Sequence, residues 1–204
     1  MADADRLSVR EAKRLQTRER LMGAAIAEFK RTGMADADVA SIVSAAGVAH
    51  GTFFFHFPTK EHVLFELERR EEARMAKRLA DYVKPGQDLA SVLNEAVHLV
   101  LGMERRLGDR LFKDSLALHF SQNRPPSEDG SDHPLIVLVA HELTVARSAG
   151  EIDEDVKPVH SAIFFLLGLY ALLITTCEWP TRDEMLKDYV AQTLRGLLPA
   201  RGIR

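Results

Sequence analysis

Residues 38–60, with the sequence DVASIVSAAGVAHGTFFFHFPTK, hold positions that suit contact with a phosphate or a base rather than covalent chemistry. Gly51 permits close approach to its backbone, because it carries no side chain. Thr52 can donate its hydroxyl proton to a phosphate or a base, and Lys60 brings a charge and backbone amides to the start of a helix. These residue types suit a contact with nucleic acid, provided that the fold places them on one surface.

The apolar residues of the same segment indicate how those positions are held. Four of them recur at three- and four-residue spacing and predict one face of a helix: Val39, Ile42, Val43 and Ala46. Gly47 is expected to end this helix in the left-handed conformation. Phe53 and Phe57 stand four residues apart, so a second helix over residues 49–57 can bury both side chains. Pro58 ends it. The pattern is that of a helix-turn-helix, whose second helix reads DNA.

Over roughly residues 14–67 the chain resembles the TetR family of transcriptional regulators. The positions that carry the resemblance are matched without an insertion: Phe29, Gly33, Ile42, Ala45, Ala46, Gly47, Val48, Gly51, Thr52, Phe57, Pro58 and Lys60. The resemblance implies a DNA-binding domain, residues 1–58, with three helices. It also implies a helical effector-binding and dimerisation domain, residues 59–204, that forms a homodimer through its last two helices.

The resemblance further implies which residues face the operator. The candidate DNA-binding residues are Arg18, Asp38, Ala49, His50, Gly51, Thr52, Phe54, Phe55, His56 and Lys60. The family often has Thr or Ser where this chain has Asp38 and Ala49, and Tyr where it has Phe54. A phenylalanine cannot donate to a phosphate, and an aspartate can repel one, although Asp38 also suits a helix cap. We therefore hypothesise that operator binding depends on the basic segment from Arg6 to Arg20.

Two features of this region have two interpretations each. The basic segment is either an extension of the first helix, started by a capping box at Ser8 and Glu11, or a flexible arm. Phe54 and Phe55 either contact thymine methyls and sugars or pack on a partner, whereas Phe53 packs in the core.

The composition of the 204-residue chain is unremarkable, but its charge is unevenly distributed. Residues 1–60 hold nine Lys or Arg and seven Asp or Glu, a net charge of +2. Because the whole chain carries −3, residues 61–204 carry −5. The amino-terminal part is thus the better partner for phosphate. A single cysteine, Cys177, excludes an intramolecular disulfide, and the lack of a signal-peptide pattern favours the cytoplasm.

Motifs of catalysis are missing from the sequence, which has no nucleophile elbow, phosphate-binding loop or metalloprotease pattern. We therefore expect neither enzyme activity nor a cofactor. The eight histidines, among them His119, His133 and His141, have no compact ligand spacing, and the only cysteine is distant. No metal site is expected.

The rest of the chain predicts helices and no strands, so the expected fold is all-α. One helix is expected to begin at Lys60, and the next to carry apolar residues from Leu89 to Val100. Further helices are expected over residues 109 to about 122, 135–149, 159–177 and 181 to about 197. Asp88 is expected to cap one of them, and Thr181 with Glu184 forms a capping box for the last. Residues 124–133 are predicted to be a surface loop.

Residues 159–177, VHSAIFFLLGLYALLITTC, contain no Asp, Glu, Lys or Arg. A membrane span of about 20 apolar residues is one interpretation, but His160, Ser161 and two threonines interrupt the run. The alternative is a helix buried on all sides, which in a TetR-like protein pairs with the last helix across a dimer. We adopt the buried helix and expect no contact with a membrane.

The carboxy-terminal half contains the residue types of a ligand cavity, which is mostly apolar with few polar groups. The candidate effector-binding residues are Met103, Phe112, Leu116, His119, Phe120, Leu138, His141, Phe164 and Phe165. Ordinary core packing explains the same residues one by one, and the resemblance is what favours a cavity. The expected function is that of a repressor that binds a palindromic operator as a dimer and is released by a small, largely apolar effector. The alternative is a helical small-molecule-binding protein whose head has lost specific operator affinity.

Overall fold

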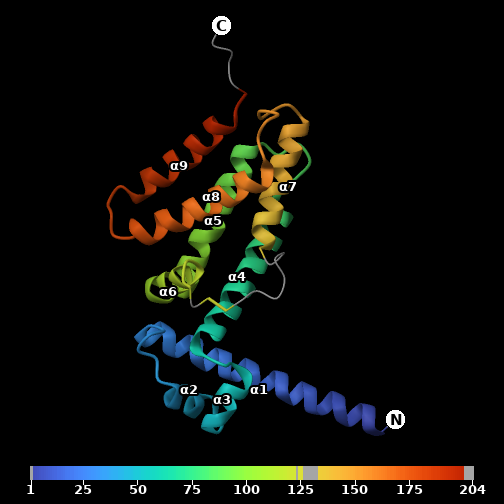
Figure 1. Ribbon diagram of the computed structural model, residues 1–204, viewed down its shortest axis with the longest axis vertical. Coiled ribbons are helices and arrows are strands. Elements are labelled where there is room, and N and C mark those ends of the chain that lie inside the picture. The colour runs from blue at the N-terminus through green and yellow to red at the C-terminus, as the bar shows by residue number, and fades with distance from the viewer. Residues whose placement is uncertain (1, 123, 126–132, 200–204) are drawn as a thin grey trace. The chain divides into compact units, whose positions relative to one another are not determined.

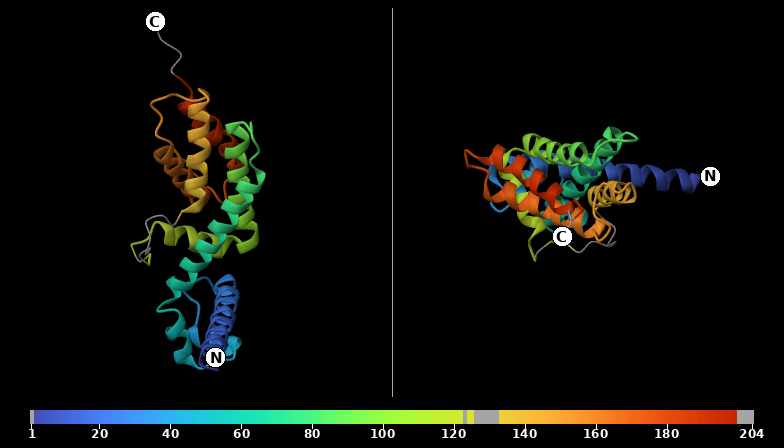
Figure 2. Two further views of the ribbon diagram at one scale, coloured as in Figure 1. Left: turned by 90° about the vertical axis from the view of Figure 1, so that its right-hand side faces the viewer. Right: turned by 90° about the horizontal axis from the view of Figure 1, so that it is seen from above.

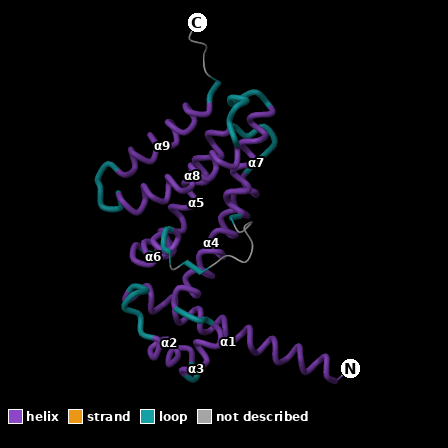
Figure 3. The backbone as a smooth tube through the Cα atoms, viewed as in Figure 1, coloured by secondary structure: helices purple, strands orange, loops and turns teal. Residues whose placement is uncertain are grey.

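The computed structural model describes residues 2–122, 124–125 and 133–199, with side chains from residue 9 onward. The regular structure of these residues is helical throughout, without a strand (Figure 3). In chain order, and with the labels of Figure 1, the helices are α1 (Ala2–Thr32), α2 (Val39–Ala46), α3 (His50–His56), α4 (Lys60–Tyr82), α5 (Leu89–Leu107), α6 (Asp109–His119), α7 (Pro134–Ser148), α8 (Pro158–Thr175) and α9 (Arg182–Leu197). The predicted all-α class is confirmed.

The chain divides into two compact units by packing. Unit 1 comprises Met1–Glu68 and Leu107–Pro126, and unit 2 comprises Arg69–Arg106 and Ser127–Arg204. Helix α4 therefore contributes residues to both units, and α6 belongs to the unit that contains the helix-turn-helix. The division by function at residue 58 stays a prediction, because packing does not test which segment serves which function.

The core of unit 1 is built from the positions that the sequence pattern predicts. Phe53 is fully buried and Phe57 is 1% exposed, and Phe29 of α1 and Ile42 of α2 are fully buried as well. Burial of a phenylalanine side chain stabilises a fold by about 1.5 to 3 kcal/mol. These residues therefore fix α3 against the two preceding helices.

The turn between α2 and α3 also forms as predicted. The carboxylate of Asp38 caps α2, because it accepts hydrogen bonds from the backbone amides of Ala40 and Ser41 at 3.1 and 3.0 Å. Gly47 ends the helix with a φ of 62° and a ψ of 45°, the left-handed conformation that glycine adopts without strain.

Helix α1 includes the basic segment, so the helix extension rather than the flexible arm is present. The helix begins at Ala2, ahead of Ser8 and Glu11, and the predicted capping box therefore does not start it. Its amino-terminal turns run on past α2 and α3 (Figures 1 and 2). The basic residues from Arg10 to Arg20 consequently have fixed positions on a helix surface.

Helix α6 is fastened to the end of α1 by two polar contacts. Arg110 Nη1 donates to the carbonyl oxygen of Arg31 at 2.9 Å, and Asp114 Oδ2 accepts from the backbone amide of Met34 at 2.7 Å. Arg110 and Asp114 stand four residues apart, so they share one face of α6. Gly33, with a φ of 87°, lies beside this face: a Cβ there would be 3.3 Å from Arg110 Cδ.

In unit 2, α8 packs against both α7 and α9. Tyr189 of α9 stacks on Phe165 of α8 with the ring centroids 5.7 Å apart, and its hydroxyl donates to the Phe165 carbonyl oxygen at 2.6 Å. Gly168 permits this approach, because a Cβ there would lie 3.1 Å from Tyr189 Cζ and closer still to the hydroxyl. Burial raises the pKa of Tyr189 to about 12, so the hydroxyl keeps its proton.

Helix α8 is long and apolar enough to cross a membrane, with a mean hydropathy of 1.9, and 33% of it is buried. Val159 and Phe164 are exposed at 56% and 70%. The single chain therefore leaves part of this helix exposed, and the expectation that a dimer buries the rest of residues 159–177 stays a prediction. Its exposed apolar face is of the kind that another surface covers.

Two predicted helix ends differ from the structure. Helix α6 ends at His119 rather than near Gln122. Thr181 precedes α9 without a side-chain cap, because its ψ of 6° is not the extended backbone that a cap requires, so the capping box does not form. The cap at Asp88 is confirmed, with the Ser91 amide 2.8 Å from Asp88 Oδ1. Most of the predicted surface loop at residues 124–133 lies outside the described residues.

Candidate nucleic-acid interface

Helix α3 presents two phenylalanines on the side opposite its buried anchors. Phe53 and Phe57 hold the helix in the core, whereas Phe54 is 49% exposed and Phe55 is 72% exposed. Adjacent exposed aromatic side chains on a surface helix are typical of a contact surface. The structure thus supports an outward face of α3 that is available to a partner.

The first turn of α3 is accessible to a large ligand. Ala49 precedes the helix with an extended backbone and no side-chain cap, and its carbonyl accepts from the Thr52 amide at 2.9 Å. His50 and Gly51 are exposed, and Thr52 is half-buried. No atom lies within 4 Å of a Cβ placed at Gly51. The turn therefore offers its backbone and one hydroxyl to a phosphate or a base edge.

The carboxylate of Asp38 is engaged by its own helix. Besides the two amides of the α2 cap, it accepts a hydrogen bond from the Ser41 hydroxyl at 3.0 Å. These hydrogen bonds, led by the one from the Ala40 amide, hold the pKa of Asp38 below its ordinary value. The carboxylate is thus charged at neutral pH, and the contacts favour its role as a helix cap over a contact with DNA.

Arg18, a predicted DNA contact, lies against the carboxyl end of α3. Its Nη1 donates to the carbonyl oxygen of His56 at 2.6 Å, and its Nη2 pairs with the carboxylate of Glu66. The guanidinium also lies over the ring of Phe57, with Cζ 4.2 Å from the ring centroid. With 31% of its side chain exposed, Arg18 is placed to brace α3 rather than to reach a phosphate.

Two further cations bond to carbonyl groups of the protein itself. Lys60 Nζ donates to the carbonyl oxygens of Ala35 and Ala37 at 2.8 and 3.0 Å. Arg20 donates to the carbonyl oxygen of Ala46 at the end of α2. Positive charge at such an end stabilises the helix. A contact between Lys60 and the operator would therefore share its ammonium group with the loop between α1 and α2.

Three basic residues on α1 face solvent: Arg10, Lys13 and Arg14. Their spacing of three and four residues places them on one face of the helix. Within the described residues, no ion pair engages their side chains. The pKa of His56 is lowered by burial and then by the charges of Arg18 and Arg14, so its imidazole is neutral at neutral pH.

The predicted effector-binding residues are divided between the two units. Unit 1 contains Phe112, Leu116, His119 and Phe120, and unit 2 contains Met103, Leu138, His141, Phe164 and Phe165. Four of them are buried: Met103, Phe112, Leu116 and Phe165. Phe120 and Phe164 are exposed at 51% and 70%. The predicted effector-binding residues therefore do not line a single cavity in the described part of the chain.

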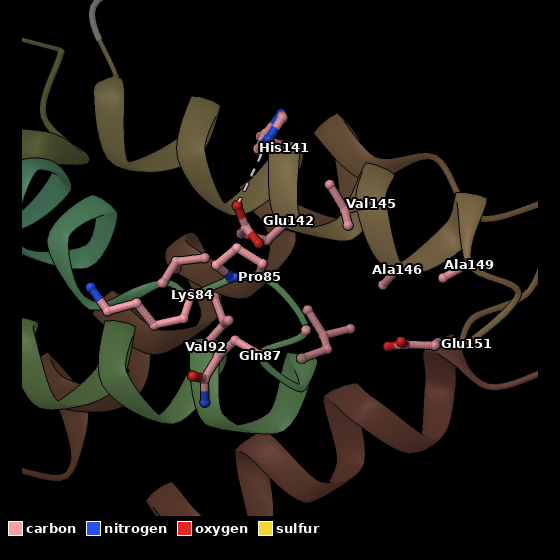
Figure 4. Close-up of a pocket in the computed structure, with 13 residues that line it drawn as sticks. Lys84, Pro85, Gln87, Val92, His141, Glu142, Val145, Ala146, Ala149 and Glu151 are labelled. Atoms are coloured by element: carbon pink, nitrogen blue, oxygen red, sulfur yellow. Dashed lines mark ion pairs between the residues drawn. The ribbon is translucent and has the colours of Figure 1, made fainter.

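A groove of about 440 Å³ in unit 2 lies between α7 and the loop that joins α4 to α5 (Figure 4). Apolar side chains line most of it, and His141, Glu142 and Glu151 contribute polar groups. His141 Nε2 is 3.9 Å from Glu142 Oε1. Of the predicted effector-binding residues, His141 alone lines this groove.

Sequence reasoning missed a group of buried acids on α4: Glu68, Glu71 and Glu72 are exposed at 8%, 8% and 6%. Glu68 Oε1 lies 2.6 Å from His119 Nδ1 and 3.2 Å from Arg124 Nη1. The signal was present, because these glutamates share the three- and four-residue spacing of the buried leucines of α4. Acids at core positions of a helix require specific partners.

Two of the histidines contact these acids. His119 contacts Glu68, and His133 Nδ1 lies 3.2 Å from Glu72 Oε2. In the part of the chain that the structure describes, no group of three or more His, Cys, Asp or Glu side chains is placed to hold a metal ion. For the whole chain, the expectation of no metal site stays a prediction.

Residues 21–67 match the family described as "Bacterial regulatory proteins, tetR family". The chain is 30% identical over 122 residues to the HTH-type transcriptional regulator CymR of Pseudomonas putida. That alignment covers 55% of this chain and 54% of CymR, so the chain spans about half the length of this relative.

Solved structures share the fold over most of the chain. FadR of Thermus thermophilus, described as a TetR-family transcriptional repressor in complex with lauroyl-CoA, has a TM-score of 0.69 at 23% identity and covers 92% of this chain and 98% of its own. RolR in complex with resorcinol has a TM-score of 0.67 at 19% identity, with 93% and 91% covered. At these identities the likeness concerns the fold. The residues that match the TetR family pattern, 21–67, form the helix-turn-helix within this fold, so this part of the chain is similar to the DNA-binding part of that family.

Proposed function

We propose that the protein is a homodimeric transcriptional regulator that binds an operator through α3 and releases it when the helical body binds a small molecule. The observation that carries this proposal is the outward face of α3. Two buried phenylalanines hold the helix, while Phe54, Phe55 and the first turn are directed at solvent. A helix that is anchored in the core on one side and exposed on the other fits the major groove of DNA, where phenylalanine can contact thymine methyls.

Phosphate contacts come from α1 in this proposal. Arg18, Arg20 and Lys60 bond to the protein's own groups, whereas Arg10, Lys13 and Arg14 present their charges to solvent on one helix face. This arrangement supports the hypothesis that operator binding depends on the basic segment, and among the described side chains of that segment it favours these three. Such contacts supply affinity that weakens with salt but carry no sequence information.

The homodimer is proposed to form through α8 and α9. Val159, Phe164 and Trp179 are exposed at 56%, 70% and 53% in or next to this pair. A two-fold interface would cover that apolar face, which the single chain leaves in water. Two-fold symmetry would also place two copies of α3 on the two halves of a palindromic operator. We also propose that the protein acts in the cytoplasm.

An effector is proposed because fold neighbours bind small molecules of different chemistry, lauroyl-CoA in FadR and resorcinol in RolR. The default role is repression, with release of the operator on effector binding. An effector can shift the protein away from DNA only by as much as its affinity differs between the DNA-bound and DNA-free conformations. Effector and operator therefore weaken each other's binding by the same factor.

The decisive experiment is binding of the full-length protein to the DNA upstream of its own gene, against a scrambled duplex, across a series of salt concentrations. A preference of about a thousandfold that weakens with salt supports the proposal. Sedimentation of the free protein and of the complex gives the stoichiometry, and two chains per operator are expected.

A triple variant tests the phosphate contacts: Arg10→Gln, Lys13→Gln and Arg14→Gln combined. Each phosphate contact that is lost should lower the slope of log affinity against log salt by about 0.9. The matched control is Lys77→Gln with Arg78→Gln on α4, two exposed cations whose loss should leave the slope unchanged. Equal, weak binding of both duplexes would instead favour the alternative function, a small-molecule-binding protein without specific operator affinity.

A further inference from the structure

Glu68 of α4 has a buried carboxylate oxygen without a hydrogen-bond partner. The residue is 8% exposed, and its Oε2 has neither solvent nor a donor. An unpaired buried acceptor is rare in native proteins, because the group has lost its water without gaining a replacement. This atom therefore requires an explanation that the α4 packing alone does not supply.

The other oxygen of the same carboxylate is fully engaged. Glu68 Oε1 lies 2.6 Å from His119 Nδ1 and 3.2 Å from Arg124 Nη1. Arg124 in turn lies over the ring of Phe65, with Cζ 5.2 Å from the ring centroid. These contacts fix the carboxylate and supply it with positive charge, so it need not bind a further cation. Its Oε2 therefore has a fixed orientation and can accept a hydrogen bond from a neutral donor.

Ser115 supplies a second unpaired polar atom in the same unit. Its residue is 1% exposed, and its Oγ has no hydrogen-bond partner. Ser115 lies four residues before His119 on α6, so it is on the same side of the helix as His119, the residue that contacts Glu68. Around them Phe112 and Leu116 are buried apolar residues. The face thus combines an unpaired acceptor, an unpaired hydroxyl and apolar surroundings, which is the composition of a ligand site.

We propose that this α4–α6 face binds the hydroxyl group of an apolar effector, such as a phenol or an alcohol. The ligand hydroxyl donates its proton to Glu68 Oε2 and accepts the proton of Ser115 Oγ. A hydroxyl is both donor and acceptor, whereas an ammonium has no lone pair for the serine and adds a cation beside Arg124. The inference rests on the proposed function and specifies the class of its effector.

Four probes that share a p-tolyl group separate the possibilities: p-cresol, 4-methylanisole, toluene and 4-methylbenzylamine. NMR titration of the full-length protein gives their dissociation constants. Because a hydrogen bond to a charged group is strong, p-cresol should bind at least roughly tenfold tighter than the methyl ether, which can only accept, and than toluene. Equal binding of p-cresol and its ether, no binding of p-cresol, or tighter binding of the amine would overturn the proposal.

Two variants and one control test whether the preference for p-cresol depends on Ser115 and Glu68. Ser115→Ala removes a hydroxyl that bonds to nothing, so the fold should be retained while the preference for p-cresol over toluene falls several-fold. Glu68→Gln should abolish the preference over the ether. Glu72→Gln is the control, since Glu72 is as buried and lies on the same helix, but both its oxygens lie within 3.3 Å of His133 Nδ1. A preference unchanged in Ser115→Ala and Glu68→Gln would place the probe elsewhere and refute the site.

The same preparations keep this proposal distinct from the proposed function. Operator binding is measured without probe, and probe binding is measured without DNA. A protein that binds its operator but does not distinguish p-cresol from the ether refutes the hydroxyl site alone. A protein that distinguishes the probes but binds no operator supports the site and contradicts the regulatory role.

Discussion

Replacement of Arg18 by methionine tests whether Arg18 stabilises α3 or contacts DNA. Methionine keeps most of the aliphatic stem and removes the guanidinium, which bonds the His56 carbonyl, pairs with Glu66 and lies over Phe57. A hydrogen bond from a charged group contributes about 1.5 to 3 kcal/mol. The contact with the ring adds about 0.5 to 1 kcal/mol, and a partly exposed ion pair adds about 0.2 to 1 kcal/mol.

These contributions overlap, so the expected loss of unfolding free energy is about 2 to 4 kcal/mol. For a chain of this length such a loss lowers Tm by at least about 4 °C. Operator affinity should also fall, because α3 is held less firmly. The fall should be the same at every salt concentration, since no phosphate contact is removed, and the slope of log affinity against log salt should stay unchanged.

Arg14→Met is the matched control, because Arg14 lies one turn earlier on α1 and is exposed. It should leave Tm unchanged and lower the salt slope by about 0.9 for each head. Differential scanning calorimetry and the salt series provide the two measurements. If Arg18→Met leaves Tm unchanged and reduces the salt slope, Arg18 is a phosphate contact and the bracing argument is refuted.

Three further predictions concern α3 and the α8–α9 pair. Phe55→Ala should lower operator affinity roughly tenfold and change the free energy of unfolding by less than about 0.5 kcal/mol. Phe53→Ala should instead lower the free energy of unfolding by about 3 to 5 kcal/mol, and denaturation and DNA titration of both variants measure these effects. Gly168→Ala should force α8 from α9 and cost about 1 to 3 kcal/mol, and adding Tyr189→Phe should recover part of the Tm, so a single variant as stable as the wild type contradicts the contact. The folded-state pKa of His56 lies below 6.5, so the unfolded chain binds the proton more readily. The free energy of unfolding should therefore fall as the pH drops below about 6.5. Urea titrations from about pH 7.5 to about pH 5.5 should show a smaller loss of stability in His56→Gln than in the wild type.

Local patterns in the sequence predicted the helix-turn-helix well. The cap at Asp38, the left-handed turn at Gly47 and the buried pair Phe53 and Phe57 each depend on residues a few positions apart. Helix spacing and turn chemistry act over that range, so periodicity is enough to place them. The end of α2 and the anchoring of α3 follow for the same reason.

Contacts between distant segments were not predictable in this way. The hydrogen bond from Arg18 to the carbonyl oxygen of His56 joins residues 38 positions apart, so no local pattern indicates it, and a contact of Arg18 with DNA stays a prediction. The contact between Glu68 and His119 spans 51 residues, and no local pattern indicates it either. Which residues meet across helices depends on how the helices pack, and a single sequence does not encode that packing as a local pattern.

The two bonds between α6 and the end of α1 have a consequence for the order of folding during synthesis. Arg110 and Asp114 reach groups at Arg31 and Met34 that the ribosome releases about eighty residues earlier. The helix-turn-helix therefore emerges without the helix that completes its unit, and it must wait for α5 and α6 to be made. Contacts of such long sequence separation slow folding, because a large loop must close before they form. A nascent chain stalled before residue 107 would thus have its helix-turn-helix without the two bonds that α6 makes to the end of α1.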